Sequence, residues 1–428
     1  MIRWLYSLAM VLAQPLLRRK LARRARQEPG YGYAVQERFG HYAGPAWPDD
    51  GRTLWIHAVS LGETRAAAVL LAQLRLHTPG LRLLLTHGTA TGRAEGGHLL
   101  QPGDAQAWLP WDTPQAVQRF LAHFRPRLGL LMETEVWPNL VAACAQAGMP
   151  LVLANARLSP KSLHQAQRLA WLARPAYRAL HAVWAQTPQD AQRLRALGVA
   201  GCEVLGNVKF DATPDATQLA QGRGWRVHAA RPVVMFASSR EGEEQELLDW
   251  LSRRPEAASV QWLIVPRHPQ RFDAVAALVQ ARGLGLSRRS QWQDGPPPTE
   301  AQVWLGDSLG EMALYYGLSD AALLGGSFAP LGGQNLIEAA ACACPVLMGP
   351  HTFNFSQAAE LAEAAHAATR HANLADAAQT ALQLVAQPAQ QAQAAQAARQ
   401  FAQAHRGATG RTVAQVLRLL GQQGVDGL

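Results

Sequence analysis

The sequence contains little cysteine. Four cysteines occur among its 428 residues, too few and too widely separated to form a disulfide framework. Cys342 and Cys344 lie close together, but no second pair accompanies them, which argues against a zinc site. We therefore expect Cys144, Cys202, Cys342 and Cys344 to be core thiols of a protein in a reducing compartment, of which the cytoplasm is the simplest.

The apolar stretch near the start is too short to cross a bilayer as a helix. It reads WLYSLAMVLAQPLL over 4–17 and has 14 residues, whereas a spanning helix needs about 20. Seven basic residues and one acidic residue lie within 1–30. Apolar and aromatic side chains followed by arginines favour a membrane-anchoring segment over 1–30, which either lies on the membrane or enters it shallowly. A signal peptide and an ordinary buried first helix are the alternatives.

Outside that segment, positive and negative charges nearly balance. The chain has 40 Lys and Arg against 31 Asp and Glu, a net charge of +9, and most of the excess lies within 1–30. The remainder is nearly neutral and has no basic stripe interleaved with aromatics, so we expect no nucleic-acid partner.

Several motifs for metal-bound nucleotides are missing. No G-x-x-x-x-G-K-[S/T] motif occurs, and no G-x-G-x-x-G follows the first apolar run of either half. Asp49-Asp50 lies in a polar loop, and no convincing Asp-x-Asp is found. We therefore expect neither a metal nor a cofactor. A glycine-rich, metal-free site for a nucleotide sugar remains open.

Short continuous apolar runs alternate with helix-length segments along the chain. Such runs predict parallel strands whose sheets are covered on both faces, and hence an α/β fold of two doubly wound Rossmann-like domains. We expect domains over 31–210 and 225–428, a linker over 211–224, and a last helix that packs back on the first domain. The expected strands are 54–59, 81–86, 128–132, 151–154, 183–186 and 203–205, then 233–237, 262–265, 303–305, 321–324 and 345–348.

Ionisable residues follow several strands of the first domain. Ligands of doubly wound sheets bind outside the carboxyl ends of the strands, so these loops should converge. Glu63 lies in HAVSLGE after the first strand, where Gly62 would permit a sharp turn. For each residue alone, an ion pair or a helix cap is an alternative explanation. The other candidates are Glu133, Glu135, Asn155, Arg157, Lys161, Asn207, Lys209 and Asp211.

The second domain repeats this arrangement. Arg267 and His268 follow one strand, and Asp307, Gly310 and Glu311 follow another. Two glycine pairs in LLGGSFAPLGGQNLIE would let backbone N–H groups approach a phosphate closely. Glu338, in the helix that follows, could accept both hydroxyls of a ribose.

Together these pieces resemble a known family, the Kdo (3-deoxy-D-manno-octulosonic acid) transferases, which are inverting glycosyltransferases of the GT-B type. The resemblance implies two domains facing a cleft. It also implies an enzyme on the cytoplasmic side of the inner membrane that moves Kdo from CMP-Kdo to a lipid A precursor, lipid IVA, in lipopolysaccharide biosynthesis without a metal. The matching pieces, in family order, are ERFG, HAVSLGE, ETEVWPN, NARLS, GNVKFD, GEE, PRHPQR, LGE, GGSF, GGQNLIE and GPHTFNF.

The resemblance also implies roles for residues of this chain. Glu63 would be the general base that deprotonates the acceptor hydroxyl, and Glu133 and Lys209 would stabilise the transition state. The sequence departs from the family pattern at Arg240, Leu309 and Gln334. The implied donor-binding residues are Pro266, Arg267, His268, Leu309, Gly310, Glu311, Gly326, Ser327, Asn335, Leu336, Ile337 and Glu338.

Two other functions remain open at this point. One is a GT-B transferase that uses a UDP-sugar, and the other is a non-catalytic, membrane-attached glycolipid-binding protein. Protection against thermal unfolding by CMP but not by UDP would separate the first from a Kdo transferase, and turnover of CMP-Kdo would exclude the second. No motif in the sequence indicates the number of Kdo units added, the acyl-chain preference or the oligomeric state.

Overall fold

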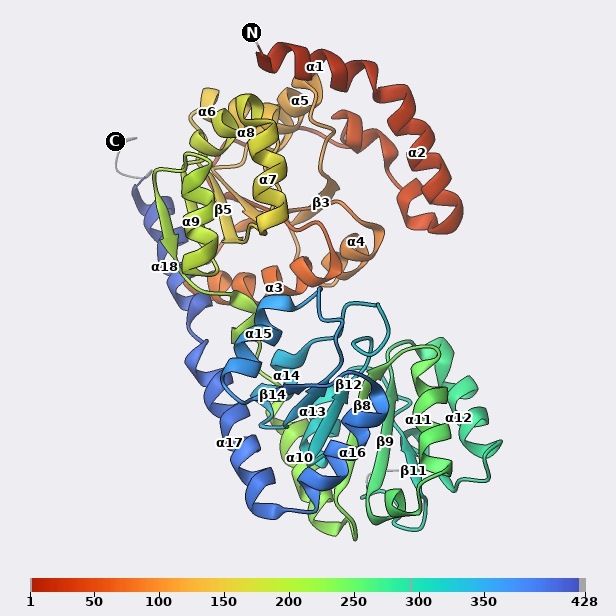
Figure 1. The fold of residues 1–428 in the computed structure, drawn as a ribbon. Coiled ribbons are helices and arrows are strands. Elements are labelled where there is room, and N and C mark those ends of the chain that lie inside the picture. The colour runs from red at the N-terminus through yellow and green to blue at the C-terminus, as the bar shows by residue number, and fades with distance from the viewer. Residues whose placement is uncertain (1, 293–294, 423–428) are drawn as a thin grey trace. The chain divides into compact units, whose positions relative to one another are not determined.

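The computed structural model describes residues 2–292 and 295–422, and the chain forms two compact units (Figure 1). Unit 1 comprises Met1–Asp211 and Arg406–Leu428, and unit 2 comprises Ala212–His405. The chain therefore returns to unit 1 for its last helix. Each unit has its own parallel sheet with helices on both faces, which is the α/β architecture that the apolar runs predict.

The sheet of unit 1 has seven parallel strands. They are β1 (Thr53–His57), β2 (Arg82–His87), β3 (Ala105–Trp108), β4 (Leu128–Met132), β5 (Leu151–Ala156), β6 (Ala182–Ala185) and β7 (Cys202–Val204). Their order in the sheet is β3-β2-β1-β4-β5-β6-β7. Every residue of β1 and β4 is buried, because helices cover both faces of the sheet. The sequence did not predict β3, a short edge strand whose first two residues are only half-buried.

The helices of unit 1 begin at clear sequence signals. Thr113, Ser159 and Thr187 each cap a helix whose first residue is proline, the residue best suited to that position. The helices are α1 (Ile2–Leu12), α2 (Gln14–Gln27), α3 (Leu61–His77), α4 (Ala90–Gly97), α5 (Pro114–Phe124), α6 (Pro138–Gln146), α7 (Pro160–Arg168), α8 (Ala170–Arg178), α9 (Pro188–Ala196) and α18 (Ala408–Gln422), and the 3₁₀ turns are η1 (Pro29–Gly32), η2 (Val35–Phe39) and η3 (Val208–Asp211).

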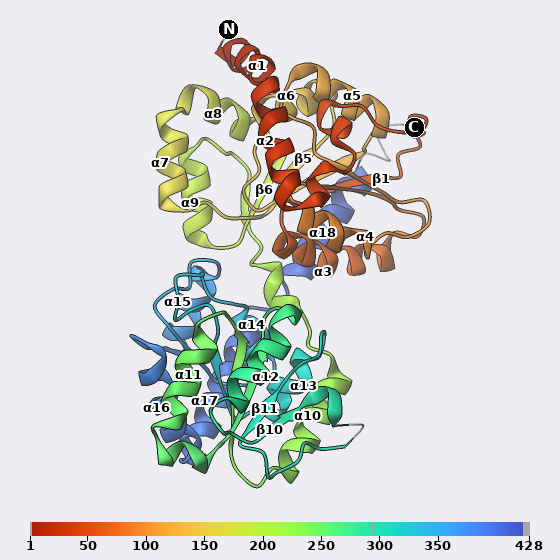
Figure 2. The same cartoon turned by 90° about the vertical axis from the view of Figure 1, so that its right-hand side faces the viewer.

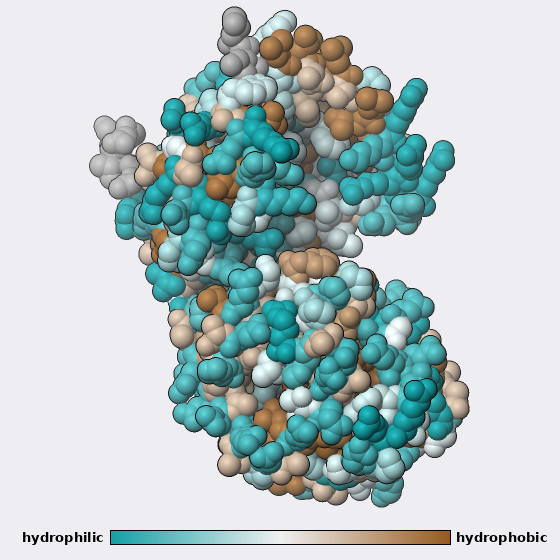
Figure 3. Space-filling view, in the orientation of Figure 1, coloured by the Kyte–Doolittle hydropathy of each residue, from teal (hydrophilic) through white to brown (hydrophobic). Residues whose placement is uncertain are grey.

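The first two helices stand together on one side of unit 1 (Figure 2). Trp4, Leu5 and Leu12 of α1 are 64%, 57% and 69% exposed, whereas Leu21 of α2 is buried. Figure 3 shows apolar side chains gathered over α1 and hydrophilic ones over α2. Within residues 2–292 and 295–422, no helix combines the length and hydropathy that crossing a membrane requires.

Unit 2 also contains a sheet of seven parallel strands. They are β8 (Val233–Ser239), β9 (Gln261–Pro266), β10 (Leu286–Arg288), β11 (Val303–Leu305), β12 (Ala321–Leu324), β13 (Val346–Met348) and β14 (Ala368–Arg370). Their order is β10-β11-β9-β8-β12-β13-β14. The sequence did not predict β10 and β14. Each has three residues, at an edge of the sheet, and lacks a continuous apolar run.

The helices of unit 2 cover both faces of this sheet. The Ala- and Gln-rich region forms helices, as its composition predicts. The helices are α10 (Ala216–His228), α11 (Glu243–Ser252), α12 (Phe272–Gln280), α13 (Met312–Leu318), α14 (Leu336–Ala341), α15 (Ser356–Ala364), α16 (Leu374–Val385) and α17 (Pro388–Ala404), and the 3₁₀ turns are η4 (Pro255–Ser259), η5 (Pro269–Arg271) and η6 (Arg289–Gln291).

The segment expected to be a linker, 211–224, is mostly helix α10. Gly222 lies against α13 so closely that a Cβ atom there would be 2.1 Å from the carbonyl oxygen of Leu314. Trp225 of the same helix is buried. Gly222 thus belongs to no linker, because its missing side chain allows two helices to pack backbone to backbone. The four cysteines are buried and free, as expected.

Candidate functional site

Glu63 and Glu133 lie at the point where the strand order of unit 1 reverses. The reversal lies between the adjacent strands β1 and β4. In doubly wound sheets, ligands bind at such a reversal, outside the carboxyl ends of the strands. Glu63 is on the helix that follows β1, and Glu133 follows β4 directly. The topology therefore brings together two carboxylates that are 70 positions apart in the sequence.

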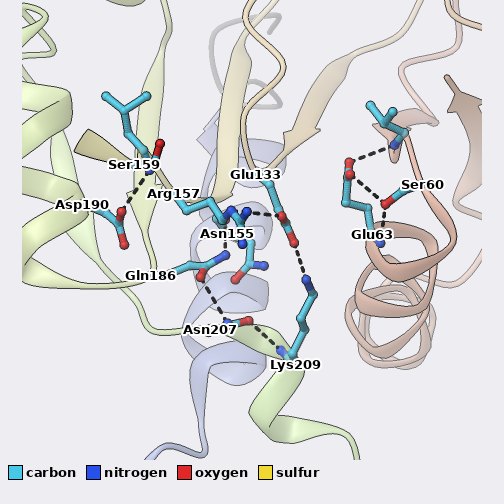
Figure 4. A network of polar contacts seen from close by, with 12 residues as sticks. Ser60, Glu63, Glu133, Asn155, Arg157, Ser159, Gln186, Asp190, Asn207 and Lys209 are labelled. Atoms are coloured by element: carbon cyan, nitrogen blue, oxygen red, sulfur yellow. Dashed lines mark hydrogen bonds and ion pairs between the residues drawn. The ribbon is translucent and has the colours of Figure 1, made fainter. Parts of the chain in front are cut away.

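Ser60 and Glu63 begin helix α3 with reciprocal hydrogen bonds similar to a capping box, except that the carboxylate accepts from Val59 N–H, one residue before the cap. Ser60 Oγ accepts a bond from Glu63 N–H, while Glu63 Oε1 accepts from Ser60 Oγ and Oε2 accepts from Val59 N–H, both at 2.9 Å. Figure 4 shows the carboxyl group folded back onto this turn. Gly62, expected to form a sharp turn, is instead inside the first turn of α3 and has no positive φ angle. The capping bonds, rather than a flexible glycine, hold the carboxylate in place.

The environment of Glu63 favours its protonated form more than water does. Burial raises the pKa of Glu63 to about 7, the negative charges of Glu133 and Glu135 add to this, and the bonds from Val59 and Ser60 oppose it. A carboxyl group with a pKa near neutrality can take a proton in one step and release it in another.

Glu133 is a buried carboxylate held by cations. It is 7% exposed, its φ angle is 63°, and such a left-handed conformation is uncommon for a residue other than glycine. Its Oε1 lies 2.6 Å from Lys209 Nζ, and its Oε2 lies 3.7 Å from Arg157 Nε. Strained residues of this kind persist where the surroundings impose them, often at functional sites.

A chain of amide side chains positions Lys209 (Figure 4). Asn207 Oδ1 accepts from Lys209 N–H at 3.0 Å, and Asn207 Nδ2 donates to Gln186 Oε1 at 3.1 Å. Gln186 Nε2 in turn donates to the carbonyl of Asn155 at 2.9 Å, and Asn155 Oδ1 accepts from Val208 N–H at 3.1 Å. Sequence reasoning selected Asn155 and Asn207 but missed Gln186, although it ends a predicted strand.

The remaining candidates of unit 1 separate into two groups. Glu135 lies in the same turn as Glu133, accepts a bond from Trp137 Nε1 at 2.8 Å, and has a pKa raised by burial. Asp211 accepts bonds from the N–H groups of Gly407 and Thr409, and so ties the start of α18 to η3. Asp211 therefore has a structural role. Lys161, the other candidate, is exposed to solvent.

In unit 2 the strand order reverses between β8 and β12, and basic residues follow β8 and its other neighbour, β9. Arg240 follows β8, while Arg267 and His268 follow Pro266, the last residue of β9. Arg267 N–H donates to the carbonyl of Ser239 at 3.0 Å, which fixes the two loops together. Burial and the charges of Arg240 and Arg267 lower the pKa of His268. Arg240 and Arg267 form a cationic patch suited to a phosphate.

A glycine-rich loop follows β12, and Glu243 stabilises it by accepting hydrogen bonds from its N–H groups. Both carboxylate oxygens of Glu243 accept from Gly326 N–H, at 2.8 and 2.9 Å, and one accepts from Ala329 N–H at 3.2 Å. Gly325 admits no side chain, because a Cβ atom would lie 2.4 Å from the carbonyl oxygen of Ser238. Sequence reasoning quoted Glu243 within GEE but gave it no role.

Several predicted donor contacts can involve only the backbone. Ser327 is fully buried, and its hydroxyl donates to the carbonyl of Leu324 and accepts from Gly349 N–H. Leu336 and Ile337 are each 1% exposed. The side chains of these three residues therefore shape the loop rather than reach into a site.

The other predicted donor residues lie on two loops. Asn335 caps α14 by accepting from Ile337 N–H, and Glu338 is in the first turn of that helix. Gly310 has a φ angle of 79°, the exposed Leu309 precedes it, and Glu311 is paired with Arg289 at 2.8 Å. Among the described residues, no group of three or more His, Cys, Asp or Glu side chains could hold a metal.

Comparison with known proteins identifies the family. Residues 33–212 match the family described as 3-deoxy-D-manno-octulosonic-acid transferase (kdotransferase). The 3-deoxy-D-manno-octulosonic acid transferase of Bordetella pertussis is 46% identical over 83% of this chain and 85% of its own, and that of Haemophilus influenzae is 33% identical over 83% and 84%. A solved glycosyltransferase from Rickettsia africae shares the fold, with a TM-score of 0.56 over 87% of this chain and 98% of its own at 13% identity. The chain thus belongs to the Kdo transferase family of glycosyltransferases.

Proposed function

We propose that the protein is an inverting enzyme that transfers Kdo from CMP-Kdo to a lipid A precursor, lipid IVA, in lipopolysaccharide biosynthesis, with Glu63 as the general base. The observation that carries this proposal is the carboxyl group of Glu63. It lies where the strand order reverses, is held by the capping bonds, and has a pKa of about 7. A base whose pKa is close to the working pH is deprotonated in a large fraction of molecules and is still basic enough to accept a proton.

The chemistry of this transfer is a single displacement. The acceptor oxygen bonds to the anomeric carbon of Kdo as the bond from that carbon to the phosphate oxygen of CMP breaks. The oxygen attacks the face of the anomeric carbon opposite the phosphate, so the configuration at this carbon inverts, and Glu63 takes the proton of the acceptor hydroxyl. We assign Lys209, paired with Glu133, to the stabilisation of negative charge that develops during the displacement.

The departing CMP carries a phosphate, and the cationic patch of unit 2 supplies groups for it. Arg267 and Arg240 can donate charge-assisted hydrogen bonds to phosphate oxygens, and the N–H groups of the glycine loop can add to them. We propose that these groups, rather than a metal, neutralise the leaving group, and that Glu338 binds the ribose hydroxyls. Turnover that persists in the presence of EDTA would support this assignment, and turnover that requires an added divalent cation would reject it.

Removal of Arg267 or Glu338 should weaken donor binding. Loss of a charge-assisted hydrogen bond costs about 1.5 to 3 kcal/mol, so Arg267→Ala and Glu338→Ala should each raise the Kd for CMP about ten- to a hundredfold. Calorimetric titration with CMP measures this, and UDP should bind weakly to every variant. The matched controls are Arg254→Ala and Glu256→Ala, an exposed ion pair of the same unit, which should bind CMP normally. Unchanged CMP affinity in both test variants would reject the assignment.

We also propose that α1 and α2 attach the protein to the cytoplasmic face of the inner membrane. Three exposed apolar side chains of α1 and the basic residues of α2 suit an anionic lipid surface. The triple variant Trp4→Gln/Leu5→Gln/Leu12→Gln should bind anionic vesicles at least about tenfold more weakly, since each buried apolar side chain contributes about 1.5 to 3 kcal/mol. Vesicle co-sedimentation measures the loss.

A control for this experiment lies elsewhere on the chain. Leu76, Leu169 and Val227 are 72%, 51% and 81% exposed, so Leu76→Gln/Leu169→Gln/Val227→Gln removes a similar amount of exposed apolar surface. This control should bind vesicles as the wild type does. Equal binding by the α1 variant and the wild type would mean that another surface attaches the protein.

A further inference from the structure

Helix α1 has an inner face that packs against the rest of unit 1, where the helix contacts α6 and α8 (Figure 2). The apolar side chains proposed to meet the membrane are exposed, whereas Tyr6 and Ser7 are half-buried. Ser7 Oγ lies 2.9 Å from Asn139 Oδ1 of α6. The hydroxyl group of Tyr6 donates to the carboxyl group of Asp112. Specific hydrogen bonds therefore dock α1 on unit 1, although attachment to a membrane does not require them.

Asp112, in the loop between β3 and α5, holds the start of α6. It is 3% exposed, its Oδ2 accepts from Asn139 N–H at 2.9 Å, and its Oδ1 accepts from Leu140 N–H at 2.8 Å. These N–H groups belong to the first turn of α6, where a helix provides no partners of its own. Trp137 occupies the capping position of α6 and offers no acceptor, so Asp112 replaces the usual cap.

Tyr6 completes the bonding of this buried carboxyl group. Burial raises the pKa of Asp112, and the bonds from Tyr6 and from the two N–H groups of α6 oppose this rise. Burial and the charge of Asp112 raise the pKa of Tyr6, so its hydroxyl group keeps the proton that it donates. Loss of a hydrogen bond from a buried carboxylate is costly, because water cannot replace the donor. Tyr6 therefore stabilises the group that caps α6.

A turn of five residues, 133–137, connects β4 to α6 and carries carboxyl groups of the site. Glu133, the first of the five, has a left-handed φ angle of 63°. At the β4 end of the turn, Glu133 N–H donates to the carbonyl of Ala154 at 3.0 Å, and the carbonyl of Glu133 accepts from Arg157 N–H at 3.2 Å. At the other end, Asp112 holds α6. A strained conformation persists because its surroundings impose it, and here both ends of a short turn are fixed.

We propose that Tyr6 is a positioning residue for catalysis, which acts through Asp112 on the turn that carries Glu133. The bond from Tyr6 fixes the start of α6, and the fixed turn keeps Glu133 paired with Lys209. This inference rests on the proposed function, in which Lys209 stabilises the developing charge, and it gives α1 a role besides membrane attachment. Without the bond from Tyr6, the start of α6 can shift, Glu133 can relax, and its 2.6 Å contact with Lys209 Nζ lengthens. Displacements of about 1 Å can cost up to about 100-fold in rate.

The test variant is Tyr6→Phe, which removes the donated hydrogen bond and keeps the ring. The matched control is Tyr33→Phe, because Tyr33 is 65% exposed and does not bond to Asp112. Turnover is measured with saturating CMP-Kdo and acceptor glycolipid in neutral detergent micelles, so that attachment to an anionic membrane has no influence. Vesicle co-sedimentation, the melting temperature and the Kd for CMP are measured in parallel.

Tyr6→Phe should lower kcat about ten- to a hundredfold in a protein that is still folded at the assay temperature. The acceptor KM should change much less than kcat, because the affected contact acts in the transition state. Vesicle binding should equal that of the wild type, since the exposed apolar side chains of α1 remain, and the Kd for CMP should also be unchanged, since the proposed donor site is in unit 2. Tyr33→Phe should match the wild type in every measurement.

A second pair of variants tests whether Tyr6 acts through Lys209. In the Lys209→Met background the ammonium group is already absent, so adding Tyr6→Phe should lower kcat by no more than about twofold, because both changes remove the same interaction. If Tyr6→Phe has the kcat of the wild type, or if it lowers kcat by the same factor in both backgrounds, the inference is wrong. If the wild type transfers nothing from CMP-Kdo to the acceptor, the proposed function fails instead.

Discussion

The Glu63→Gln variant should bind CMP normally and lose about two to four orders of magnitude in kcat, which is the usual contribution of a positioned general base. Glutamine keeps the shape of the side chain and one oxygen that can accept from Val59 N–H or Ser60 Oγ, so the start of α3 should still form. It loses the basic oxygen that takes the acceptor proton. Single-turnover kinetics with saturating CMP-Kdo would measure the chemical step directly.

The pH dependence provides a second readout for Glu63. Its pKa is raised to about 7, so the carboxylate is partly protonated at neutral pH and fully ionised only above it. The base must be ionised, and kcat/KM of the wild type should therefore rise with pH and level off above about pH 7 to 8. The residual activity of Glu63→Gln should lack this rise.

The control carboxylate is Glu95 of α4. It is paired with the exposed Arg65 at 2.9 Å, and Glu95→Gln should retain both turnover and the pH profile. Turnover of Glu63→Gln close to that of the wild type would eliminate Glu63 as the base. A lowered melting temperature together with lost CMP affinity would mean that Glu63 maintains the fold instead.

Replacement of Lys209 should have the second-largest effect. Lys209→Met removes the ammonium group 2.6 Å from Glu133 Oε1. Of the cations paired with Glu133 in the described part of the chain, the more distant Arg157 remains, beside a carboxylate that is 7% exposed. Removal of one partner from a buried ion pair destabilises a protein, here by about 1.5 to 3 kcal/mol because Lys209 is partly exposed. We expect a fall of several degrees in melting temperature and a loss of about 100-fold or more in kcat.

A double variant distinguishes the structural part of this effect from the catalytic part. Glu133→Gln/Lys209→Met removes both charges, so most of the lost stability should return. If Lys209 stabilises the transition state, activity should not return with it. Recovery of both would show that Lys209 acts only by compensating Glu133, and an unaffected kcat in Lys209→Met would reject its role altogether.

Much of the fold, and the family, could be predicted from the sequence. Continuous apolar runs such as 128–132 are buried on both faces, and this requires helices on both sides of a parallel sheet. Thr113-Pro114 and Ser159-Pro160 begin helices for purely local reasons. The ordered series from ERFG to GPHTFNF indicated the Kdo transferase family, which the relatives confirm.

Other features depend on residues that only the folded chain brings together. Edge strands such as β3 carry no continuous apolar run, and Gly222 could not be recognised as a packing contact until Leu314 lay against it. The sequence by itself determined which residues follow the strands. The tertiary structure decided which of them meet, because charge interactions and burial depend on distance in space. The pKa of Glu63 is therefore raised partly by the charge of Glu133, which lies 70 positions away in the sequence.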